Sequence, residues 1–126
     1  MKSIWLLIAI ATLMLSTAMA AEAPVVNGTW SGTWTPKEGV ADGVTVELKV
    51  DTTGNLSGKF LAPVRMDLTK ATFTEKTRTV AIEAVDEKTN KHYKLDGKVN
   101  GSEITGMFEA GEVRGDVRLV KWTYVP

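Results

Sequence analysis

The chain of 126 residues has no cysteine and a single histidine, and its 15 basic residues balance 15 acidic ones. Without cysteine it can form no disulfide and carries no acylated N-terminal cysteine, so it is not a lipoprotein. One histidine without cysteine also leaves no ligand set for a transition metal. A formal charge of zero argues against nucleic acid and anionic membranes as partners, because both bind basic surfaces.

The chain also lacks a catalytic constellation. A nucleophilic triad needs a histidine beside Ser or Cys, but His92 lies at an outward-facing position and no Gly-x-Ser-x-Gly motif is present. The segment 51–55 resembles the start of a calcium loop but lacks its later acidic ligands, so a hairpin turn is the better interpretation. We therefore expect no catalytic residue, no metal site and no cofactor, and a protein that is not an enzyme.

The first twenty residues have the organisation of an export signal. Lys2 precedes an apolar run from Ile4 to Leu15, and Ala18-Met19-Ala20 matches the A-x-A pattern that precedes a cleavage site. The run is about a dozen residues long, shorter than the roughly 20 that span a bilayer. We expect residues 1–20 to be a cleavable signal peptide, and an uncleaved anchor is the alternative.

After cleavage, residues 21–27 are expected to form a flexible lead-in and residues 28–126 a single domain, in keeping with the length of the chain. An exported fold without disulfides depends on core packing alone. Such a protein suits the bacterial periplasm, with secretion as the alternative, and no stable membrane insertion is expected once the leader is removed.

The segment after the leader alternates apolar and polar residues and shows no helical period longer than a turn or two. Clusters of Gly, Asn, Asp or Lys interrupt this alternation at regular intervals. The pattern predicts an all-β fold, a single antiparallel up-and-down meander of about eight strands that closes into a β-barrel, with a β-sandwich as the alternative. The predicted strands span 29–35, 43–51, 55–62, 67–74, 79–86, 91–99, 102–110 and 112–122.

A short motif, apolar-x-Gly-x-apolar, recurs along these strands. Because residues two apart in a strand share a face, the glycine should lie on the buried side between two apolar neighbours. Glycine weakens an isolated strand there, and two compensations are open. The glycine allows the sharp bend that a small closed barrel needs, or it leaves room for a large side chain from across the sheet. The five glycines are Gly32, Gly58, Gly97, Gly106 and Gly115.

Two glycine-containing dipeptides predict tight hairpins. Asn100-Gly101 is typical of a type I′ turn, and Ala110-Gly111 is expected to turn in the same way. The first turn predicts two outward pairs, Lys98–Glu103 and His92–Glu109, that stabilise the sheet. The other predicted cross-strand pairs are Val99 with Ser102, Gly97 with Ile104, Leu95 with Gly106, Tyr93 with Phe108, Phe108 with Val113 and Gly106 with Gly115.

Two further turns complete the meander and keep one face apolar. A three-residue loop within Asp51–Asn55 places Gly54 in a left-handed conformation, and a four-residue loop covers Glu87–Asn90. The pairs that these turns predict are Val50 with Leu56, Leu48 with Gly58, Val46 with Phe60, Ala84 with Tyr93 and Ile82 with Leu95.

The fourth predicted strand breaks the alternation. Ala71 and Phe73 match the inward residues of the next strand, whereas Met66 and Leu68 would lie on the opposite face of the same strand. We therefore expect a β-bulge near Thr69, or a loop that ends there.

Gly28-Thr29-Trp30 opens the first predicted strand. This tripeptide resembles the Gly-x-Trp of lipocalins and the Gly-Thr-Trp of avidin-like proteins, and the number and order of strands are similar over most of the chain after the leader. The resemblance implies a calycin-like barrel, as in small exported bacterial β-barrel domains, whose first-strand tryptophan closes one end. It implies no particular ligand, and no set of polar residues matches the biotin contacts of avidins.

Large aromatic side chains supply the candidate site. An eight-stranded barrel is wide enough to be filled by its side chains or to hold one small ligand. We predict that a small hydrophobic molecule enters beside the Pro36–Asp42 loop and binds inside, with Trp30 and Trp34 acting as a ligand platform or else as core. The residues predicted to line the site are Trp30, Trp34, Phe60, Tyr93 and Phe108.

The alternative function is that of a filled barrel acting through its outer surface, as an inhibitor or interaction module for an exported protein. Val120 and Trp122 share the outward parity of the last strand and would form the contact patch. The sequence leaves both functions open, because inward glycines remove volume that the aromatic side chains restore.

Overall fold

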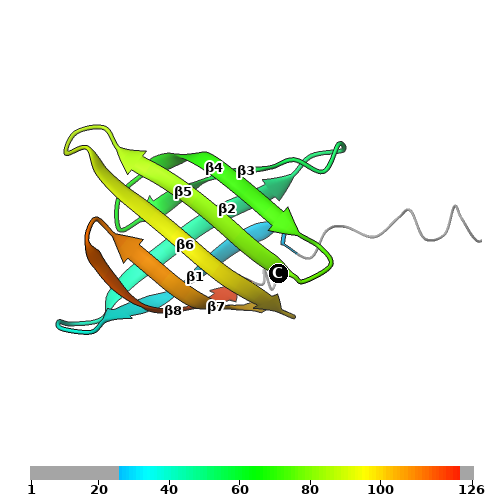
Figure 1. The fold of residues 1–126 in the computed structure, drawn as a ribbon. Helices are drawn as coiled ribbons and strands as arrows, with labels where there is room; N and C mark the ends of the chain where they lie inside the picture. The colour runs from blue at the N-terminus through cyan, green and yellow to red at the C-terminus, as the bar shows by residue number, and fades with distance from the viewer. Residues whose placement is uncertain (1–25, 123–126) are drawn as a thin grey trace, which may run out of the picture.

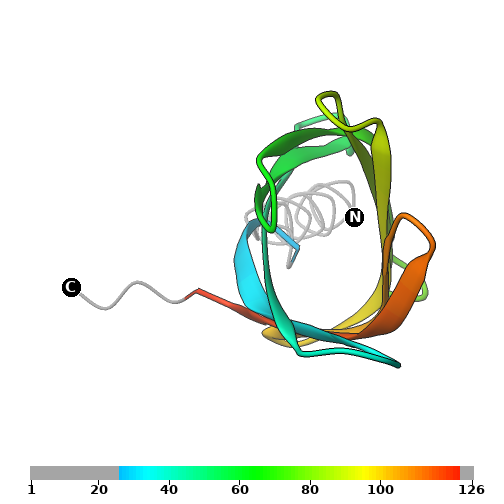
Figure 2. The same cartoon turned by 90° about the vertical axis from the view of Figure 1, so that its left-hand side faces the viewer.

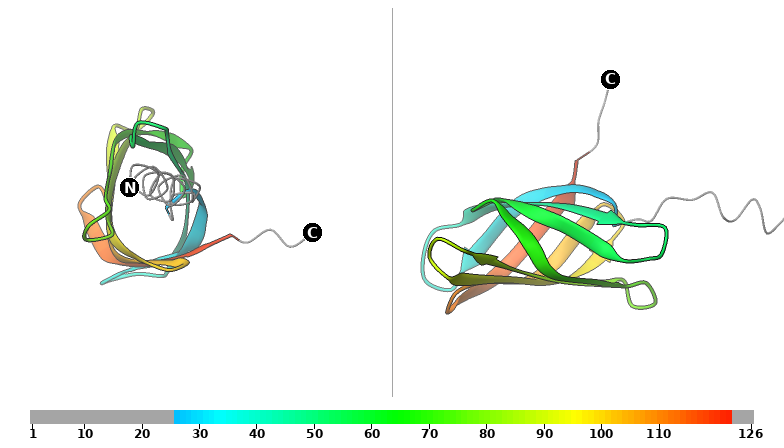
Figure 3. Two further views of the ribbon diagram at one scale, coloured as in Figure 1. Left: turned by 90° about the vertical axis from the view of Figure 1, so that its right-hand side faces the viewer. Right: turned by 90° about the horizontal axis from the view of Figure 1, so that it is seen from above.

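The computed structural model describes residues 26–122, which form one antiparallel barrel of eight strands without helices (Figure 1). Each strand pairs with the next one in sequence, and β8 pairs with β1 to close the ring seen in Figure 2 and Figure 3. The prediction of a closed barrel rather than a sandwich is confirmed. The strands are β1 Gly28–Pro36, β2 Asp42–Val50, β3 Leu56–Ala62, β4 Met66–Thr74, β5 Thr79–Asp86, β6 Lys91–Asn100, β7 Glu103–Ala110 and β8 Val113–Lys121.

The predicted signal peptide and residues 21–25 of the predicted lead-in lie outside the described residues. Within residues 26–122 no helix has the length and apolar character that crossing a membrane requires. At the start of this part of the chain, Val26 is buried and Asn27 Oδ1 accepts a hydrogen bond from the Val50 amide at 2.7 Å. These two residues therefore pack against the barrel.

The up-and-down order divides the connections between two ends of the barrel (Figure 1). We call one end the base; it carries residues 26–27 and the turns 51–55, 75–78 and 101–102. We call the opposite end the rim; it carries the loops 37–41, 63–65, 87–90 and 111–112. Odd-numbered strands run from base to rim, and even-numbered strands return.

Alternation places apolar side chains on the inner face of every strand, where they form one continuous core. Among the described residues no charged side chain is buried, and the only polar atoms carried by buried side chains are those of Tyr and Trp. The interior is therefore almost entirely apolar.

Two of the four predicted turns are confirmed together with their registers. Val50 pairs with Leu56 across the 51–55 turn, where Gly54 has the predicted positive φ of 89°. Ala84 pairs with Tyr93 across the 87–90 loop. The Asp51 carboxylate is used inside its own turn, since Oδ1 accepts hydrogen bonds from the Thr53 amide, the Thr53 hydroxyl and the Asn55 amide at 2.7–2.9 Å. Residues 51–55 thus form the predicted hairpin turn.

The other two turns lie one residue further along the chain than predicted. Gly101 and Gly111 occupy the first central position of their two-residue turns, with φ of 60° and 65°, where a type II′ turn requires glycine. The prediction of a type I′ turn at Asn100-Gly101 is therefore wrong. Each partner shifts by two residues, so inward side chains still meet inward side chains. The observed pairs are Val99 with Ile104, Gly97 with Gly106, Leu95 with Phe108, Tyr93 with Ala110, Phe108 with Gly115 and Gly106 with Val117.

The same shift replaces the predicted charge pairs between β6 and β7 by ion pairs between β7 and β8. Lys98 lies opposite Thr105 instead of Glu103, and Glu109 lies opposite Lys94 instead of His92. The two acidic residues instead reach β8, where Arg118 Nε lies 2.8 Å from Glu103 Oε1 and Arg114 Nε lies 2.9 Å from Glu109 Oε1. Exposed pairs of this kind contribute little, about 0–1 kcal/mol each.

A bulge at Thr69 is confirmed. Leu68 pairs with Ala84 and Lys70 with Glu83, which leaves Thr69 as the extra residue, and its hydroxyl donates to the Glu83 carbonyl at 3.1 Å. The bulge changes the parity of β4. Met66 is therefore buried, although it lies out of step with the inward residues later in the strand.

The five glycines of the repeated motif share the parity of the buried residues, as predicted. Of the two explanations, bending of the strand and room for a large side chain, the structure mainly supports the first. A Cβ atom added at any of four of them would lie only 1.9–2.1 Å from a backbone carbonyl oxygen of the neighbouring strand. Only at Gly97 would the nearest atom belong to a side chain, Ile104 Cγ2 at 2.7 Å. Close approach and bending of the wall therefore explain these glycines. The four that meet backbone are Gly32, Gly58, Gly106 and Gly115.

Gly106→Ala should destabilise the barrel strongly. Its new methyl group would meet Asp96 O at 2.0 Å and Gly97 Cα at 2.6 Å, and backbone cannot move aside as a side chain can. We expect a loss of about 3 kcal/mol or more in the free energy of unfolding, measured by urea denaturation. Gly43→Ala is the matched control, because no atom lies within 4 Å of its Cβ position, and it should change stability by about 0.5 kcal/mol or less. Equal effects of the two substitutions would contradict the close-approach explanation.

The Asp51 turn predicts a pH-dependent contribution to stability. The Thr53 hydroxyl, followed by the Asn55 amide, holds the pKa of the Asp51 carboxyl below its ordinary value of 3.8. A carboxylate with a lowered folded-state pKa stabilises the fold above its unfolded-state pKa, and this contribution disappears as the pH falls through the folded-state pKa. Asp51→Ala should therefore lower the Tm at neutral pH, and the difference from the wild type should narrow in strong acid.

Thermal unfolding followed by circular dichroism at about pH 7 and about pH 2 measures this effect. Asp116→Ala removes an exposed carboxylate that makes none of these turn contacts, and it should leave the Tm close to that of the wild type at pH 7. A Tm difference for Asp51→Ala that is the same at both pH values would exclude the charged form as the stabilising species.

Candidate functional site

Four of the five predicted aromatic residues meet near the rim. Trp34, Phe60, Tyr93 and Phe108 each lie two residues from the rim end of their strands, β1, β3, β6 and β7. Each of the four side chains is at most 7% exposed. We call these four residues the rim cluster. They come from positions far apart in the sequence, and barrel closure with inward alternation brings them together.

Phe108 lies at the centre of the rim cluster. Its ring centroid is 4.9 Å from that of Trp34, 6.0 Å from that of Phe60 and 6.1 Å from that of Tyr93. The first two contacts are edge-to-face and the third is tilted, so no pair is stacked face to face. Such contacts contribute about 0.5–1.5 kcal/mol each beyond the burial of apolar area.

Trp30, the fifth predicted residue, lies apart from the rim cluster. It is two residues from the base end of β1, and about 13 Å of strand separates its Cα from that of Trp34. Its indole Nε1 donates to the Val26 carbonyl at 2.9 Å, and Lys121 Nζ lies 5.5 Å from the ring centroid. This arrangement fits the core interpretation of Trp30, which fills the base beside Val26.

Trp34 differs from Trp30 in the hydrogen bonding of its indole N–H. Its Nε1 atom is buried and has no hydrogen-bond partner within the part of the chain that the structure describes. A buried donor without an acceptor costs about 1–3 kcal/mol, and such groups are uncommon in native proteins. The sequence identifies the indole but says nothing about its acceptor, so this feature was missed.

The aromatic residues of the rim cluster have small neighbours in the ladder. Tyr93 pairs with Ala84 on one side and Ala110 on the other, and Phe108 pairs with Gly115. All three small residues are buried. Tyr93 therefore has only alanines as ladder partners, whereas Phe108 has Gly115 on one side and Leu95 on the other.

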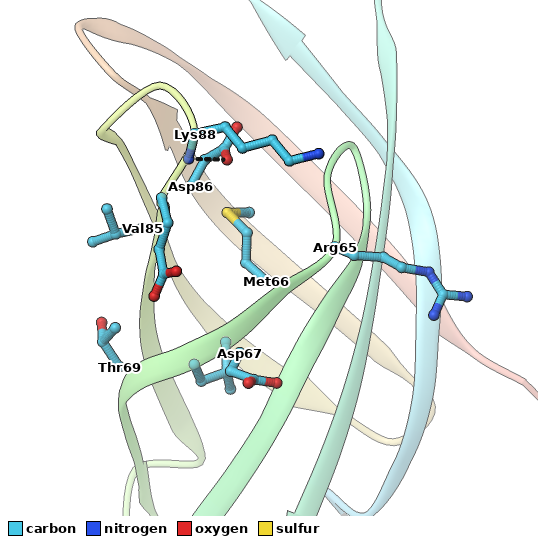
Figure 4. Close-up of a pocket in the computed structure, with 9 residues that line it drawn as sticks. Arg65, Met66, Asp67, Thr69, Val85, Asp86 and Lys88 are labelled. Carbon is cyan, nitrogen blue, oxygen red and sulfur yellow. Dashed lines mark hydrogen bonds between the residues drawn. The ribbon is translucent and has the colours of Figure 1, made fainter.

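A pocket of about 380 Å³ lies at the rim between the start of β4 and the 87–90 loop (Figure 4). Met66 extends from β4 toward this loop, whereas the Arg65 guanidinium points away from it. Met66 is only 7% exposed and pairs in register with Phe60 of the rim cluster. It thus belongs both to the pocket and to the inner face. Sequence reasoning did not select Met66, although the predicted bulge at Thr69 was the signal that turns it inward.

The β3–β4 seam, which includes Met66 and Asp67 of the pocket, has the fewest ladder pairs of the barrel, and both of its pairs lie at the rim. β3 and β4 pair at only two positions, Lys59 with Asp67 and Phe60 with Met66, whereas each other seam has six to eight pairs. A seam with few ladder bonds opens at lower free energy than the others.

A second hollow, of about 480 Å³, lies beside the 37–41 loop. It is on the outer face of the barrel and is lined by exposed residues such as Thr35 and Met107.

The electrostatics of the rim offer little for polar chemistry. Lys91 Nζ lies 5.5 Å from the ring centroid of Tyr93, and His92 is exposed on the same strand. Among residues 26–122 no group of three or more His, Cys, Asp or Glu is arranged to hold a metal ion. The rim cluster can therefore contact an apolar or aromatic molecule, and its hydrogen-bonding groups are the Trp34 indole N–H and the Tyr93 hydroxyl.

Comparison with known proteins adds no relative: no protein family, no curated protein and no solved structure matches this chain. The closed antiparallel barrel of eight strands is compatible with a calycin-like architecture. The functional conclusion therefore depends on the geometry of the rim.

The two indoles of β1 predict unequal effects of the same substitution. Both substitutions replace an indole by a smaller phenyl ring. Trp30→Phe also leaves the buried Val26 carbonyl without its donor, whereas Trp34→Phe removes a donor that has no partner. We expect Trp30→Phe to cost about 1–2 kcal/mol more in the free energy of unfolding. Urea denaturation of both variants measures the difference. An equal or larger cost for Trp34→Phe would show that its indole N–H is hydrogen-bonded in solution.

Proposed function

We propose that the protein is an exported, non-enzymatic barrel of the calycin type that binds one small hydrophobic molecule at the rim end of its interior. The observation that carries this proposal is the rim cluster, in which four buried aromatic side chains from different strands meet at one end of a closed barrel. Burial of apolar surface against such rings is favourable by about 25 cal/mol per Å². The export-signal pattern of residues 1–20 supports a periplasmic location.

The difference between the two ends supports the rim as the binding end. At the base, Val26 and Trp30 are fully buried and joined by a hydrogen bond. At the rim, both ladder partners of Tyr93 are alanines and one partner of Phe108 is Gly115, although its other partner is Leu95. In this proposal a guest packs beside these small residues at the rim and not at the packed base.

Met66 supports a route into the site. It lines the outer pocket and pairs with Phe60, at one of the two positions that join β3 and β4. A methionine side chain is unbranched and flexible, so it can change rotamer at small cost. In this proposal the ligand passes beside Met66, and entrance beside the 36–42 loop is the other route to be tested.

A second candidate function uses the outer surface, because Val120 and Trp122 are 49% and 64% exposed. Both lie near the base, on the opposite end of β8 from the rim. Under this alternative the barrel is filled, and an exported protein binds the patch formed by these two residues.

Titration with N-phenyl-1-naphthylamine, a neutral apolar fluorophore, tests the interior site. We expect saturable one-site binding by the purified protein. Ala84→Leu places a larger side chain opposite Tyr93 and should weaken binding about tenfold, equivalent to 1.4 kcal/mol. Ala84→Val is a smaller step in case the leucine variant is unstable, and circular dichroism verifies that each barrel is folded.

Trp122→Ala is the matched control on the outer face and should leave the affinity unchanged. The absence of saturable binding by the wild type would overturn the interior site. Binding that is lost in Trp122→Ala but retained in Ala84→Leu would assign the fluorophore to the outer patch and favour the second candidate function.

A further inference from the structure

The unpaired indole of Trp34 belongs to the rim cluster, so a ligand that enters this cluster would lie beside it. The side chain is 7% exposed, and its ring centroid lies 4.9 Å from that of Phe108. No residue of the described chain accepts a hydrogen bond from Nε1. On the same strand, Trp30 has an acceptor because the chain supplies the Val26 carbonyl at 2.9 Å. A ligand that brings an acceptor to Trp34 relieves an unfavourable buried donor as well as forming a bond.

The surroundings of Trp34 select a neutral acceptor. Across residues 26–122 no charged side chain is buried, and the central neighbour of Trp34 in the rim cluster is the hydrocarbon ring of Phe108. A carboxylate brought to this place would lose its hydration and receive one indole hydrogen bond in return, which leaves a buried charge poorly compensated. A carbonyl oxygen carries no charge, and a single N–H donor satisfies most of its requirement.

We propose that Trp34 is the specificity-determining residue of the interior site and that the ligand is an uncharged, largely aromatic molecule with a carbonyl oxygen. The rings of the ligand lie against Phe108 and its neighbours, and its oxygen accepts the hydrogen bond from Trp34 Nε1. This inference rests on the proposed interior site and adds the chemical class of the ligand and the residue that selects it.

Two probes of nearly the same shape isolate the contribution of the indole N–H. 2-Acetylnaphthalene and 2-isopropenylnaphthalene differ in having C=O or C=CH₂ at one position, and both can compete with N-phenyl-1-naphthylamine. Because water also binds the ketone, the informative quantity is the ratio of the ketone affinity to the alkene affinity in each protein. We expect this ratio to be about tenfold higher in the wild type than in Trp34→Phe.

Trp30→Phe is the matched control. It removes an indole from the same strand whose N–H already has the Val26 acceptor, and it should retain the wild-type ratio. In ¹⁵N–¹H spectra, the ketone should shift the indole resonance of Trp34 downfield, whereas the alkene should not. 2-Naphthoate, which carries a carboxylate on the same ring system, should bind more weakly than the ketone.

The outcomes separate this inference from the proposed function. If both naphthalene probes bind but their ratio is unchanged in Trp34→Phe, the indole is not the selecting donor, although the interior site stands. If neither probe binds and the fluorophore also fails to bind, the interior site itself is overturned. Tighter binding of 2-naphthoate than of 2-acetylnaphthalene would overturn the inference that the ligand is neutral.

Discussion

Closing a sheet of eight strands forces the backbones of neighbouring strands together at points where no side chain can be accommodated. The carbonyl oxygens of Arg118, Glu47, Asp96 and Thr35 occupy the space that a Cβ would need on the adjacent strand. Glycine alone satisfies this requirement, so the bends that close the wall are placed by the sequence at these positions. The closed barrel in turn determines which side chains meet inside, because neither β1 nor β8 is left as an open edge.

The glycines also explain why the large side chains gather toward the two ends. None of the five glycines contributes side-chain volume to the interior; Gly32, Gly97 and Gly106 lie in the middle part of their strands, and Gly58 and Gly115 lie two residues from a strand end. The aromatic residues that restore this volume stand two residues from strand ends, with Trp30 at the base and the rim cluster opposite. At the base the chain itself completes the packing, because Val26 precedes β1 and supplies an acceptor. At the rim no described residue supplies an acceptor for Trp34 Nε1.

Most of the fold could be predicted because alternation, turn residues and the glycine motif all indicate one barrel. The two glycine turns could not be placed to the residue. A type I′ turn at Asn100-Gly101 and the observed turn at Gly101 differ by a shift of two in the partner strand, and both keep every inward residue inward. What distinguishes them is three-dimensional fit: in the observed register Gly97 faces Gly106, and a Cβ atom on Gly106 would lie 2.6 Å from Gly97 Cα.

The sequence could predict which aromatic residues point into the barrel but not how they are arranged there. Inward parity identifies Trp30 and Trp34 equally, and only the register of the whole barrel places one at the base and the other beside Phe108. Met66 was missed as a site residue because its parity depends on the Thr69 bulge, whose effect on the inner face follows from the pairing of β4 with β5. The acceptor of the Trp30 indole is a backbone carbonyl, and the position of a backbone atom cannot be read from residue types.

The interactions that stabilise the barrel wall therefore involve mainly other residues than those that would bind a ligand at the rim. Seven seams of six to eight pairs hold the barrel, and the turns at the base contain the confirmed Asp51 network. The eighth seam, between β3 and β4, pairs at two positions and lies beside the Met66 pocket. Both pairs of this seam lie at its rim end, so its unpaired stretch lies toward the base. Because an unpaired stretch opens at lower free energy than a paired one, local motion of this seam is expected toward the base, while the remaining ladder keeps the barrel closed.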